Sequence, residues 1–415
     1  MKKLLILGGF PQMIDIVLTA REMGVYTIVA DRESSSPAKR FADKAFDLST
    51  NDMDGLTELC KSESIDGVFT GFEDFNIHIA CELCSRLGLP FYATREQLDC
   101  VTDKHRFKDK CRQHGVPVVE QYGLEEALKR EKYPYIVKPT DSYGSRGITV
   151  CRTEEQLLRG YDRAIAASAS RSAIIERFID SDHGTELFYT VVNGNIYLTA
   201  TADRYTVKTG VTTVPLPVAE VFPSRHEREM EQELDLSIRN MLADLNICNG
   251  LVLIQALWQD GEFFVYEMAY RLTGEQHYRL VAKQQGINLS VMMISLALGE
   301  NVSEYNTEKI SNKFFVHPSV NYAVVLKPGR IATVRGLERV YKIDEVISYN
   351  LTHFDNDVIA ASGDYSHMLI RINMVAGDYE SLCRAVKDVN SYISVVSDAG
   401  EDMVFCRFEL PGREV

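Results

Sequence analysis

The first hundred residues alternate short apolar runs with helix-like segments, and this alternation constrains the fold more than any other feature of the chain. Apolar runs separated by helices are typical of a doubly wound parallel sheet, whose two faces are both covered. The strands are expected at Leu4–Leu7, Tyr26–Ala30, within Asp66–Gly71 and at Pro90–Ala93, with helices at Met13–Met23 and up to Leu87.

Beyond this region the pattern becomes mixed, and β-rich runs predict an α+β centre built on antiparallel strands, followed by a C-terminal α+β part. The boundaries are expected near residues 100 and 310, which divides the chain into 1–100, 101–310 and 311–415. Strands are expected at Ala173–Phe178, Leu187–Val192, Ile196–Ala200, Leu251–Trp258, Phe263–Met268, Ala323–Leu326 and His367–Met374, and helices at Glu154–Ala167, Glu227–Leu245 and Tyr379–Val389.

The net charge and the cysteines indicate which partners and which compartment to expect. The formal net charge of −14 argues against nucleic acid, because phosphate backbones are bound by clustered Lys and Arg. No stretch reaches the ~20 uninterrupted apolar residues of a membrane span, so no membrane partner is expected. The nine cysteines are odd in number and scattered, which favours free thiols in a reducing cytoplasm. We therefore expect a cytoplasmic protein that acts on small molecules.

The first segment that carries chemistry is a strand, Tyr135–Pro139, followed by a loop rich in Gly and Ser, Asp141–Gly147, and a second strand. Lys138 lies near the end of the first strand, where a buried ammonium group needs an anionic partner. Backbone N–H groups in such a loop can approach phosphate oxygens. A lysine beside a flexible loop suits a triphosphate, although a plain hairpin explains the pattern equally well.

The second segment is the apolar strand Ala173–Ile179, followed by Gly184-Thr185-Glu186. A strand that runs into a connector can present its backbone to an adenine edge, and a nearby acid can accept from ribose hydroxyls. Taken alone, an edge strand with surface charges is the favoured interpretation.

The third segment is a hairpin with the turn Gln259-Asp260-Gly261, a dipeptide type typical of tight turns. On this hairpin Gln255 and Glu267 are expected to lie across from each other on one face. Such oxygen ligands suit Mg²⁺, which keeps water and phosphate in its other positions. Period-two alternation places Arg271 on the face of Glu267, where it can stabilise charge on a transferring phosphoryl group, or simply pair with the glutamate.

Together, the order and spacing of these segments resemble the ATP-grasp superfamily, in the branch near carbamoyl phosphate synthetase large chain and biotin carboxylase. Gly8-Gly9, Gly24-Val25 and Asp31 resemble the leading domain of that family, and Asp103-Lys104 with Gly115-Val116-Pro117 resembles the entry to its nucleotide-binding part. The resemblance weakens after about residue 310. It implies an N-terminal Rossmann-like domain, central ATP-grasp lobes on antiparallel sheets and a C-terminal α+β domain.

The resemblance also implies a role for each matching residue. ATP phosphates would be contacted by Lys104 and Lys138, and the phosphate flap would include Ser145 and Gly147. Adenine would be read by the backbone from Glu176 through Phe178 to Ile179, and the ribose by Glu186. The metal ligands would be Gln255 and Glu267, with Lys138, Glu267 and Arg271 as the catalytic groups. A weaker expectation places the acceptor pocket at Asp203, Arg204, Lys208, Gly274, Gln276, His277 and Tyr278.

The activity implied is that of an ATP- and Mg²⁺-dependent carboxylate–amine ligase, which forms a carbon–nitrogen bond through an acylphosphate and releases ADP and phosphate. Two alternatives stay open: a carbamoyl phosphate synthetase- or carboxylase-like enzyme that uses bicarbonate, and a non-catalytic nucleotide-binding protein. The second is motivated by Ala269, which stands where the family usually has a metal-binding Asn. A methyl group cannot coordinate a cation, so one or two metal ions are possible. A homodimer formed through the N-terminal domain is expected by analogy.

Overall fold

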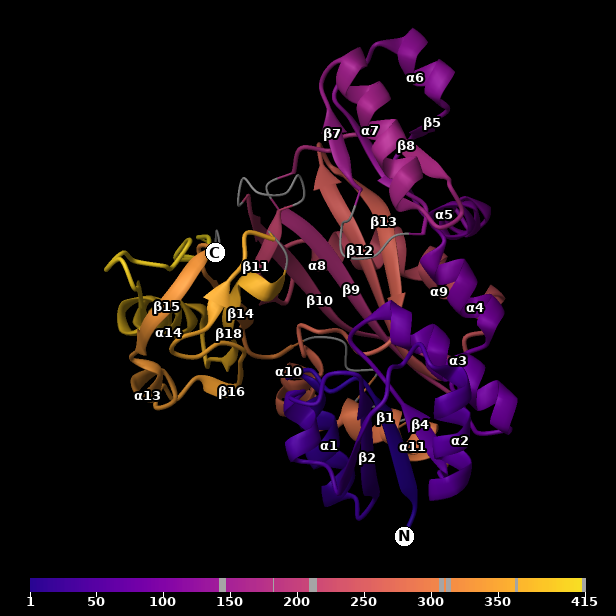
Figure 1. Ribbon diagram of the computed structural model, residues 1–415. Helices are drawn as coiled ribbons and strands as arrows, with labels where there is room; N and C mark the ends of the chain where they lie inside the picture. The colour runs from indigo at the N-terminus through magenta and orange to yellow at the C-terminus, as the bar shows by residue number, and fades with distance from the viewer. Residues whose placement is uncertain are drawn as a thin grey trace.

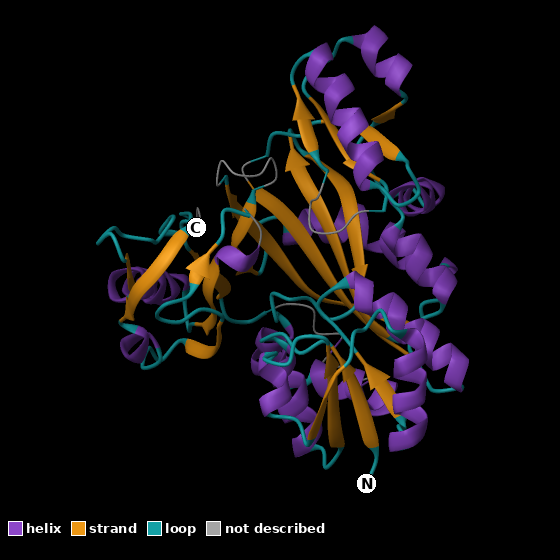
Figure 2. Ribbon diagram, viewed as in Figure 1, coloured by secondary structure: helices purple, strands orange, loops and turns teal. Residues whose placement is uncertain are grey.

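A computed structural model describes residues 1–141, 147–181, 183–208, 215–305, 310, 315–362 and 365–412. Its elements form an N-terminal α/β unit, a long central sheet, a small lobe above that sheet and a C-terminal unit beside it (Figure 1). Helices flank the sheets on their outer sides (Figure 2). Among the described residues, no helix is both long enough and apolar enough to cross a membrane.

The N-terminal unit is a parallel four-stranded sheet in the order β3-β2-β1-β4. Its strands are apolar on both faces, as the sequence predicts, because helices cover each face. The helices α2 and α3 cover one face, and α1 covers the other together with α11, which comes from much later in the chain. The bounds are β1 Lys3–Leu7, α1 Met13–Glu22, β2 Tyr26–Asp31, β3 Lys44–Asp47, α2 Met53–Glu63, β4 Gly67–Phe69, α3 Asp74–Leu87 and α11 Leu289–Ala297.

The fourth strand of this sheet lies elsewhere than predicted. Pro90–Ala93 is not a strand, and the edge strand is β3. The apolar character of residues 90–93 serves packing instead: the Tyr92 hydroxyl donates to the carbonyl of Tyr270 at 2.9 Å, and the two rings meet edge to face. The segment therefore joins the N-terminal unit to the central sheet.

The central sheet has eight strands in the order β13-β12-β9-β10-β11-β14-β18-β16, all paired antiparallel. Strands from the predicted central and C-terminal parts both contribute, so the sheet is continuous across the boundary expected near residue 310. The bounds are β9 His183–Val192, β10 Asn195–Val207, β11 Leu216–Phe222, β12 Gly250–Gln259, β13 Glu262–Tyr270, β14 Ser319–Val325, β16 Val346–Leu351 and β18 Met368–Val375.

The small lobe is a four-stranded antiparallel sheet, β5-β8-β6-β7, with the helices α6 and α7 packed on it. The Thr153 side chain accepts from the backbone N–H of Gln156 and so caps the start of α7, which begins and ends at the predicted residues. The bounds are α4 Arg95–Thr102, α5 Lys104–Gln113, β5 Gln121–Tyr122, α6 Leu124–Arg130, β6 Tyr135–Pro139, β7 Thr149–Cys151, α7 Glu154–Ala167 and β8 Ala173–Arg177.

The remaining elements cover the back of the central sheet and form the C-terminal unit, where a small sheet in the order β17-β15-β19 packs with α14. The bounds are α8 Glu227–Met230, a π-helical turn Glu231–Asp235, α9 Leu236–Asp244, α10 Tyr278–Gln285, β15 Gly329–Arg335, α13 Leu337–Val340, β17 Val358–Ile359, α14 Tyr379–Tyr392 and β19 Ser394–Ser397. Short 3₁₀ turns lie at Pro37–Arg40, Ser303–Tyr305 and Tyr365–His367.

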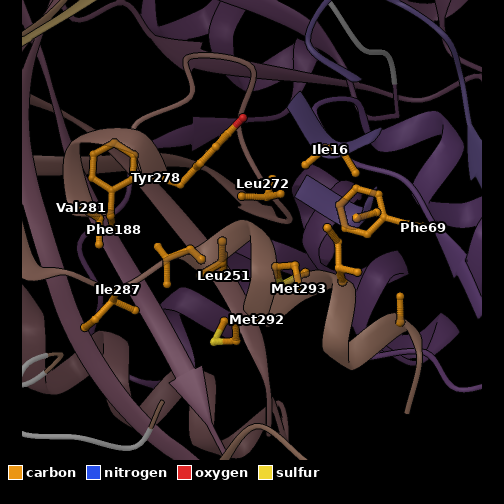
Figure 3. Close-up of a cluster of buried hydrophobic side chains, with 14 of the residues drawn as sticks. Ile16, Phe69, Phe188, Leu251, Leu272, Tyr278, Val281, Ile287, Met292 and Met293 are labelled. Carbon is orange, nitrogen blue, oxygen red and sulfur yellow. The ribbon is translucent and has the colours of Figure 1, made fainter. Parts of the chain in front are cut away.

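The largest hydrophobic cluster joins the N-terminal unit to the central sheet (Figure 3). Ile16 and Phe69 of the N-terminal unit meet Met293 of α11, and the cluster continues through Leu251 to Phe188 of the central sheet. α11 and β4 touch so closely that a Cβ at Gly67 would lie 2.1 Å from the carbonyl oxygen of Ala297. Burial on this scale fixes the N-terminal unit against the sheet that carries the site.

Candidate active site

A cleft opens between the small lobe and the central sheet, and we call it the interlobe cleft. One part of its wall is apolar, and the other part is polar and charged. The apolar residues are Ile136, Ile148, Phe178, Ile179 and Leu257. The polar residues include Lys104, Lys138, Arg204, Lys208, Gln255, Tyr266 and Glu267. Eight of the predicted site residues therefore come together here: Lys104, Lys138, Phe178, Ile179, Arg204, Lys208, Gln255 and Glu267. An apolar slot beside lysines and a carboxylate suits a base joined to phosphates.

Lys138 is held in the cleft by a buried acid. Its ammonium group lies 2.8 Å from one oxygen of Glu176, and Lys108 of α5 forms an ion pair with the other oxygen. Burial and the nearby Lys104 lower the pKa of Lys138 to about 8, and burial lowers the pKa of Lys108 to about 6. Glu176 offers one carboxylate to Lys108 and Lys138, and Lys104 also lines the cleft, so the arrangement suits an anion.

The place of Glu176 corrects the prediction for that residue. Its backbone lies inside the small sheet, paired with Gln121 on one side and Ile136 on the other, so it is not presented to the cleft. The strand β8 ends at Arg177, and only the residues after it, Phe178 and Ile179, line the cleft. The Glu176 side chain instead positions Lys138.

The predicted hairpin is confirmed in its register. Gln255 of β12 is the cross-strand partner of Glu267 of β13, so the two side chains lie next to each other on the cleft face. The turn has positive φ at Asp260 and Gly261, 55° and 87°, as a tight two-residue hairpin turn requires. The Glu267 side chain is exposed in the cleft, which leaves its carboxylate accessible to a cation.

Glu186 lies deeper than its predicted place beside a ribose. It is also a cross-strand partner of Gln255, whose side-chain amide donates to its carboxylate at 2.6 Å, and Arg204 lies 3.4 Å away. Its exposed fraction is 1%, and burial raises its pKa to about 7 despite the Arg204 guanidinium. The structure therefore corrects this prediction: Glu186 is part of the floor of the sheet and does not line the cleft.

Arg271 faces a partner that the sequence did not reveal. β13 ends at Tyr270, and the Arg271 guanidinium donates to both carboxylate oxygens of Asp74, at 2.6 and 3.0 Å. Although burial raises it, this guanidinium holds the pKa of Asp74 below its usual value. Asp74 opens α3 of the N-terminal unit. The structure therefore corrects the prediction that Arg271 faces a phosphoryl group. Its guanidinium instead forms a bidentate ion pair that joins the central sheet to the N-terminal unit.

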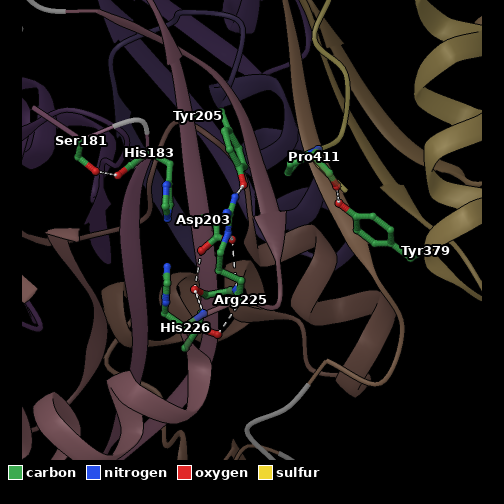
Figure 4. Close-up of polar contacts among 10 residues, drawn as sticks. Ser181, His183, Asp203, Tyr205, Arg225, His226, Tyr379 and Pro411 are labelled. Atoms are coloured by element: carbon green, nitrogen blue, oxygen red, sulfur yellow. Dashed lines mark hydrogen bonds and ion pairs between the residues drawn. The ribbon is translucent and has the colours of Figure 1, made fainter. Parts of the chain in front are cut away.

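Asp203 lies beside Arg225 (Figure 4) and is absent from the lining of the cleft. Its carboxylate accepts from the Ser224 hydroxyl at 2.6 Å and from Nε of Arg225 at 3.1 Å, and its exposed fraction is 2%. Alternation along β10 explains the difference, because the next residue, Arg204, does line the cleft. The prediction for Asp203 is therefore corrected, whereas Arg204 and Lys208 lie where a substrate can reach them.

Three residues of the predicted acceptor pocket are buried away from the cleft. Tyr278 donates its hydroxyl to Asp15 of α1 at 2.6 Å, and His277 packs its ring on Phe188, with the ring centroids 4.0 Å apart. Burial lowers the pKa of His277 to about 3, so this ring is neutral. The exposed fraction of Gln276 is 2%. These side chains hold the loop in place, and Gly274 has open space around its Cα.

Two further predicted positions belong to the phosphate flap that the sequence predicts. Ser145 lies outside the described residues. Gly147 has φ +79°, and a Cβ there would lie 2.6 Å from that of Ala167, so the position requires glycine.

Ala269 has an exposed fraction of 8% and belongs to the cluster that joins the central sheet to the N-terminal unit. The methyl group therefore fills apolar space and does not project into the cleft.

Several residues of the site were missed in the sequence. Lys108 lies three residues before the buried Cys111 on α5, and a lysine on the apolar face of a helix was the available signal. Glu220 interrupts an apolar strand, β11, in the same way. Asp74 and Arg371 gave no local signal, because their partners are distant in the chain.

The chemistry of the described residues fits one cation held by few protein ligands. Within these residues, no group of three or more His, Cys, Asp or Glu side chains is placed to hold a metal ion. The pair Gln255 and Glu267 supplies two side-chain oxygen donors in the cleft beside Lys138. This donor set suits Mg²⁺, whose remaining positions are taken by water and phosphate oxygens.

Comparison with known proteins places this geometry in context. Residues 103–305 match the family described as carbamoyl-phosphate synthase L chain, ATP binding domain. The C-terminal section of the carbamoyl phosphate synthase large chain from Methanocaldococcus jannaschii is 23% identical over 349 residues, 76% of this chain and 54% of the relative. The chain spans about half the length of the first curated relatives it matches.

Two solved structures are similar over nearly the whole chain. The L-amino acid ligase from Bacillus licheniformis superimposes with a TM-score of 0.78 at 18% identity and covers 96% of this chain and 99% of its own. The biotin carboxylase domain dimer of the Hydrogenobacter thermophilus 2-oxoglutarate carboxylase, in complex with MgADP, ADP and bicarbonate, has a TM-score of 0.75 at 18% identity, with coverages of 97% and 91%. These likenesses establish the fold.

Proposed function

We propose that this chain, which has the ATP-grasp fold and whose residues 103–305 belong to the carbamoyl-phosphate synthase L chain ATP-binding domain family, is an ATP-dependent carboxylate–amine ligase. The observation that carries the proposal is the convergence of Lys138, Gln255 and Glu267 on the interlobe cleft. Lys138 lies more than a hundred residues before Gln255 and Glu267 in the sequence. Its ammonium group and their side-chain oxygens nevertheless line one cavity.

The binding step follows from the two walls of the cleft. The adenine ring would lie against Ile136, Ile148 and Leu257, where the backbone after β8 offers hydrogen-bonding groups at Phe178 and Ile179. The phosphates would meet Lys138 and Lys104. Gln255 and Glu267 would hold Mg²⁺, which when bound neutralises phosphate charge.

The reaction needs no nucleophilic side chain from the protein. A substrate carboxylate oxygen attacks the γ-phosphorus of ATP, and the bond between that phosphorus and the β–γ bridging oxygen breaks, so ADP leaves. The amine then attacks the acyl carbon, the carbon–oxygen bond to phosphate breaks, and the amine loses a proton. The protein contributes orientation and charge neutralisation through Lys138, Glu267 and Arg204.

A screen of ADP release tests this function. The full chain is incubated with Mg²⁺, ATP and pairs of carboxylates and amines, and ADP is measured by a coupled assay. At least one pair is expected to release ADP at a rate well above that of ATP alone. If the chain binds ATP but no pair of substrates leads to ADP release, the chain is a non-catalytic nucleotide-binding protein and the ligase proposal fails.

A second candidate substrate is bicarbonate, which the names of the carbamoyl phosphate synthase and 2-oxoglutarate carboxylase relatives favour. In that case ADP release depends on added bicarbonate and requires no organic carboxylate. Assays in buffers freed of carbon dioxide separate the two substrates. For assembly, a homodimer through the N-terminal unit is proposed by analogy with the biotin carboxylase domain dimer, and sedimentation at micromolar concentration tests it.

A further inference from the structure

Below the interlobe cleft, the same face of the central sheet carries a row of buried polar side chains. Glu220 of β11 is the cross-strand partner of Arg204 on one side and of Asn321 on the other, so their side chains share a face. The opposite face of these strands is an apolar core that includes Val221, Tyr322 and Ile372. We call Glu186, Arg204, Glu220 and Arg371 the Glu220 cluster.

Glu220 is the unusual member of this cluster. Its exposed fraction is 1%, and neither of its carboxylate oxygens has a hydrogen-bond partner within the described ranges. The second oxygen of Glu186 and Nε of Arg371 are likewise buried without a hydrogen bond there. A buried charged group without partners is costly, and native structures keep such groups where a ligand completes them.

The cluster offers both signs of charge. Arg371 has an exposed fraction of 3% and donates from one terminal nitrogen to the Asn321 side-chain oxygen, which holds its guanidinium in place. Arg204 lies 3.4 Å from Glu186 and also reaches the cleft. Asn321 in turn donates to the carbonyl of Glu275, so the loop after β13 covers the cluster. Two carboxylates and two guanidinium groups together complement a small zwitterion.

The electrostatics of the cluster favour a positively charged ligand group. Burial raises the pKa of Glu220 well above its usual range, and the carboxylates of Glu186 and Glu275 raise it further, against the opposing effect of Arg371 and Arg204. A ligand group that carries positive charge would lower this pKa again.

We propose that the carboxylate substrate of this enzyme is an amino acid, whose ammonium group binds Glu220 and Glu186 and whose carboxylate is bound by Arg204 and Arg371. The inference rests on the proposed ligase function and names its substrate class. Glu186 links the two regions, because Gln255 contacts it on one side and the cluster lies on the other. Because Glu186 takes the ammonium group, the bound amino acid would lie next to Gln255. On binding, the Glu220 carboxylate accepts from the ligand ammonium group.

Calorimetry of the full chain, saturated with Mg²⁺ and a non-hydrolysable ATP analogue, tests the proposal. Each of the standard amino acids is titrated, and alanine, leucine and phenylalanine are compared with propionate, 4-methylpentanoate and 3-phenylpropionate. We expect at least one amino acid to bind, and its des-amino analogue to bind at least about 10-fold more weakly, as expected for a lost charge-assisted contact.

The variant Glu220→Gln keeps the shape and removes the charge. It should weaken amino-acid binding by about 10-fold or more, while affinity for the ATP analogue stays unchanged. Glu63→Gln, which changes a partly buried acid paired with Lys44 in the N-terminal unit, is the matched control and should change neither. If Glu220→Gln does not fold, Arg371→Lys provides the test, because it should abolish the preference for alanine over alaninamide.

The outcomes separate this inference from the proposed function. ADP release with simple carboxylates, together with no amino-acid binding or with binding that Glu220→Gln leaves unchanged, would overturn the inference and keep the ligase. Glu220-dependent amino-acid binding without ADP release would keep the inference and overturn the ligase. A thermal shift of the wild type by Mg²⁺ alone that Glu220→Gln abolishes would also overturn the inference, since the carboxylates would then hold a metal ion.

Discussion

The interlobe cleft and the Glu220 cluster lie on one face of the same sheet, yet they treat buried charge in opposite ways. In the cleft, Lys138 is 2.8 Å from Glu176, so its charge is compensated before any ligand arrives. In the cluster, Glu220 has no hydrogen-bond partner among the described residues. The cleft therefore pairs its buried lysines with an acid of the protein itself, whereas the cluster leaves Glu220 to be completed by a ligand.

The largest expected effect concerns the exposed carboxylate of the cleft. Glu267→Ala removes one of two oxygen donors of the metal hairpin and should reduce turnover by at least about 100-fold, because transition-state charge is no longer neutralised. Steady-state ADP release measures this. Glu262→Ala, at the other end of the same strand, is the control and should leave the rate unchanged. Full activity of Glu267→Ala would remove the metal hairpin from the site.

The next effect tests whether the compensated charge of the cleft binds phosphate. Lys138→Met should weaken ATP binding by about 10-fold or more, the cost of a lost hydrogen bond to a charged group. Calorimetry with a non-hydrolysable ATP analogue measures it, together with thermal unfolding, since Glu176 then keeps only Lys108. Lys39→Met removes another lysine that is almost fully buried and paired with an acid, Asp47, outside the cleft. Equal ATP affinity in both variants would contradict the phosphate assignment.

The third effect tests whether residue 269 lies in the apolar contact with the N-terminal unit or faces the metal site of the cleft. Ala269 is packed among apolar side chains, so Ala269→Asn should bury an amide without partners and destabilise the fold by about 1–3 kcal/mol. The Mg²⁺ concentration for half-maximal ADP release should stay unchanged. Chemical unfolding and a Mg²⁺ titration measure the two quantities. A lower Mg²⁺ requirement with unchanged stability would mean that residue 269 faces the metal after all.

The smallest effect is a pH dependence of stability that originates in Glu186. Burial raises its folded pKa from 4.5 to about 7, so the folded state binds more protons than the unfolded state between these values. The free energy of unfolding therefore falls as pH rises from about 4.5 to 7, with a contribution of at most ~1.4 kcal/mol per pH unit. Urea unfolding across this range should show a flatter slope in Glu186→Gln. An unchanged slope would assign the dependence to other groups.

The sequence predicts correctly those features that depend on residues close together in the chain. The hairpin of Gln255 and Glu267 follows from alternation and an Asp-Gly turn, both contained within a few residues, and its register is confirmed. The parallel sheet follows from a repeated local pattern. Arg271 was placed by extending the alternation of β13, but the strand ends one residue earlier and the side chain turns to Asp74.

The Glu220 cluster illustrates what a local pattern cannot reveal. Glu220 and Arg371 belong to strands that are brought together only by the strand order of the central sheet. The strand β11 contains Pro217 and escaped prediction, although an acid between Ala219 and Val221 marked a polar position inside an apolar run. Glu186 was recognised by its motif, yet its depth in the sheet depends on pairing with β12, which is again a non-local property.

The close contact between α11 and β4 also bears on how the chain is made. The strands β1, β2 and β4 are synthesised before the small lobe, but the helix that completes the cover of their second face follows the entire small lobe and five of the eight strands of the central sheet. Until then, the apolar side of the nascent N-terminal unit stays uncovered and open to chaperones or to premature association. The N-terminal unit is thus begun before the small lobe is translated but completed only after it.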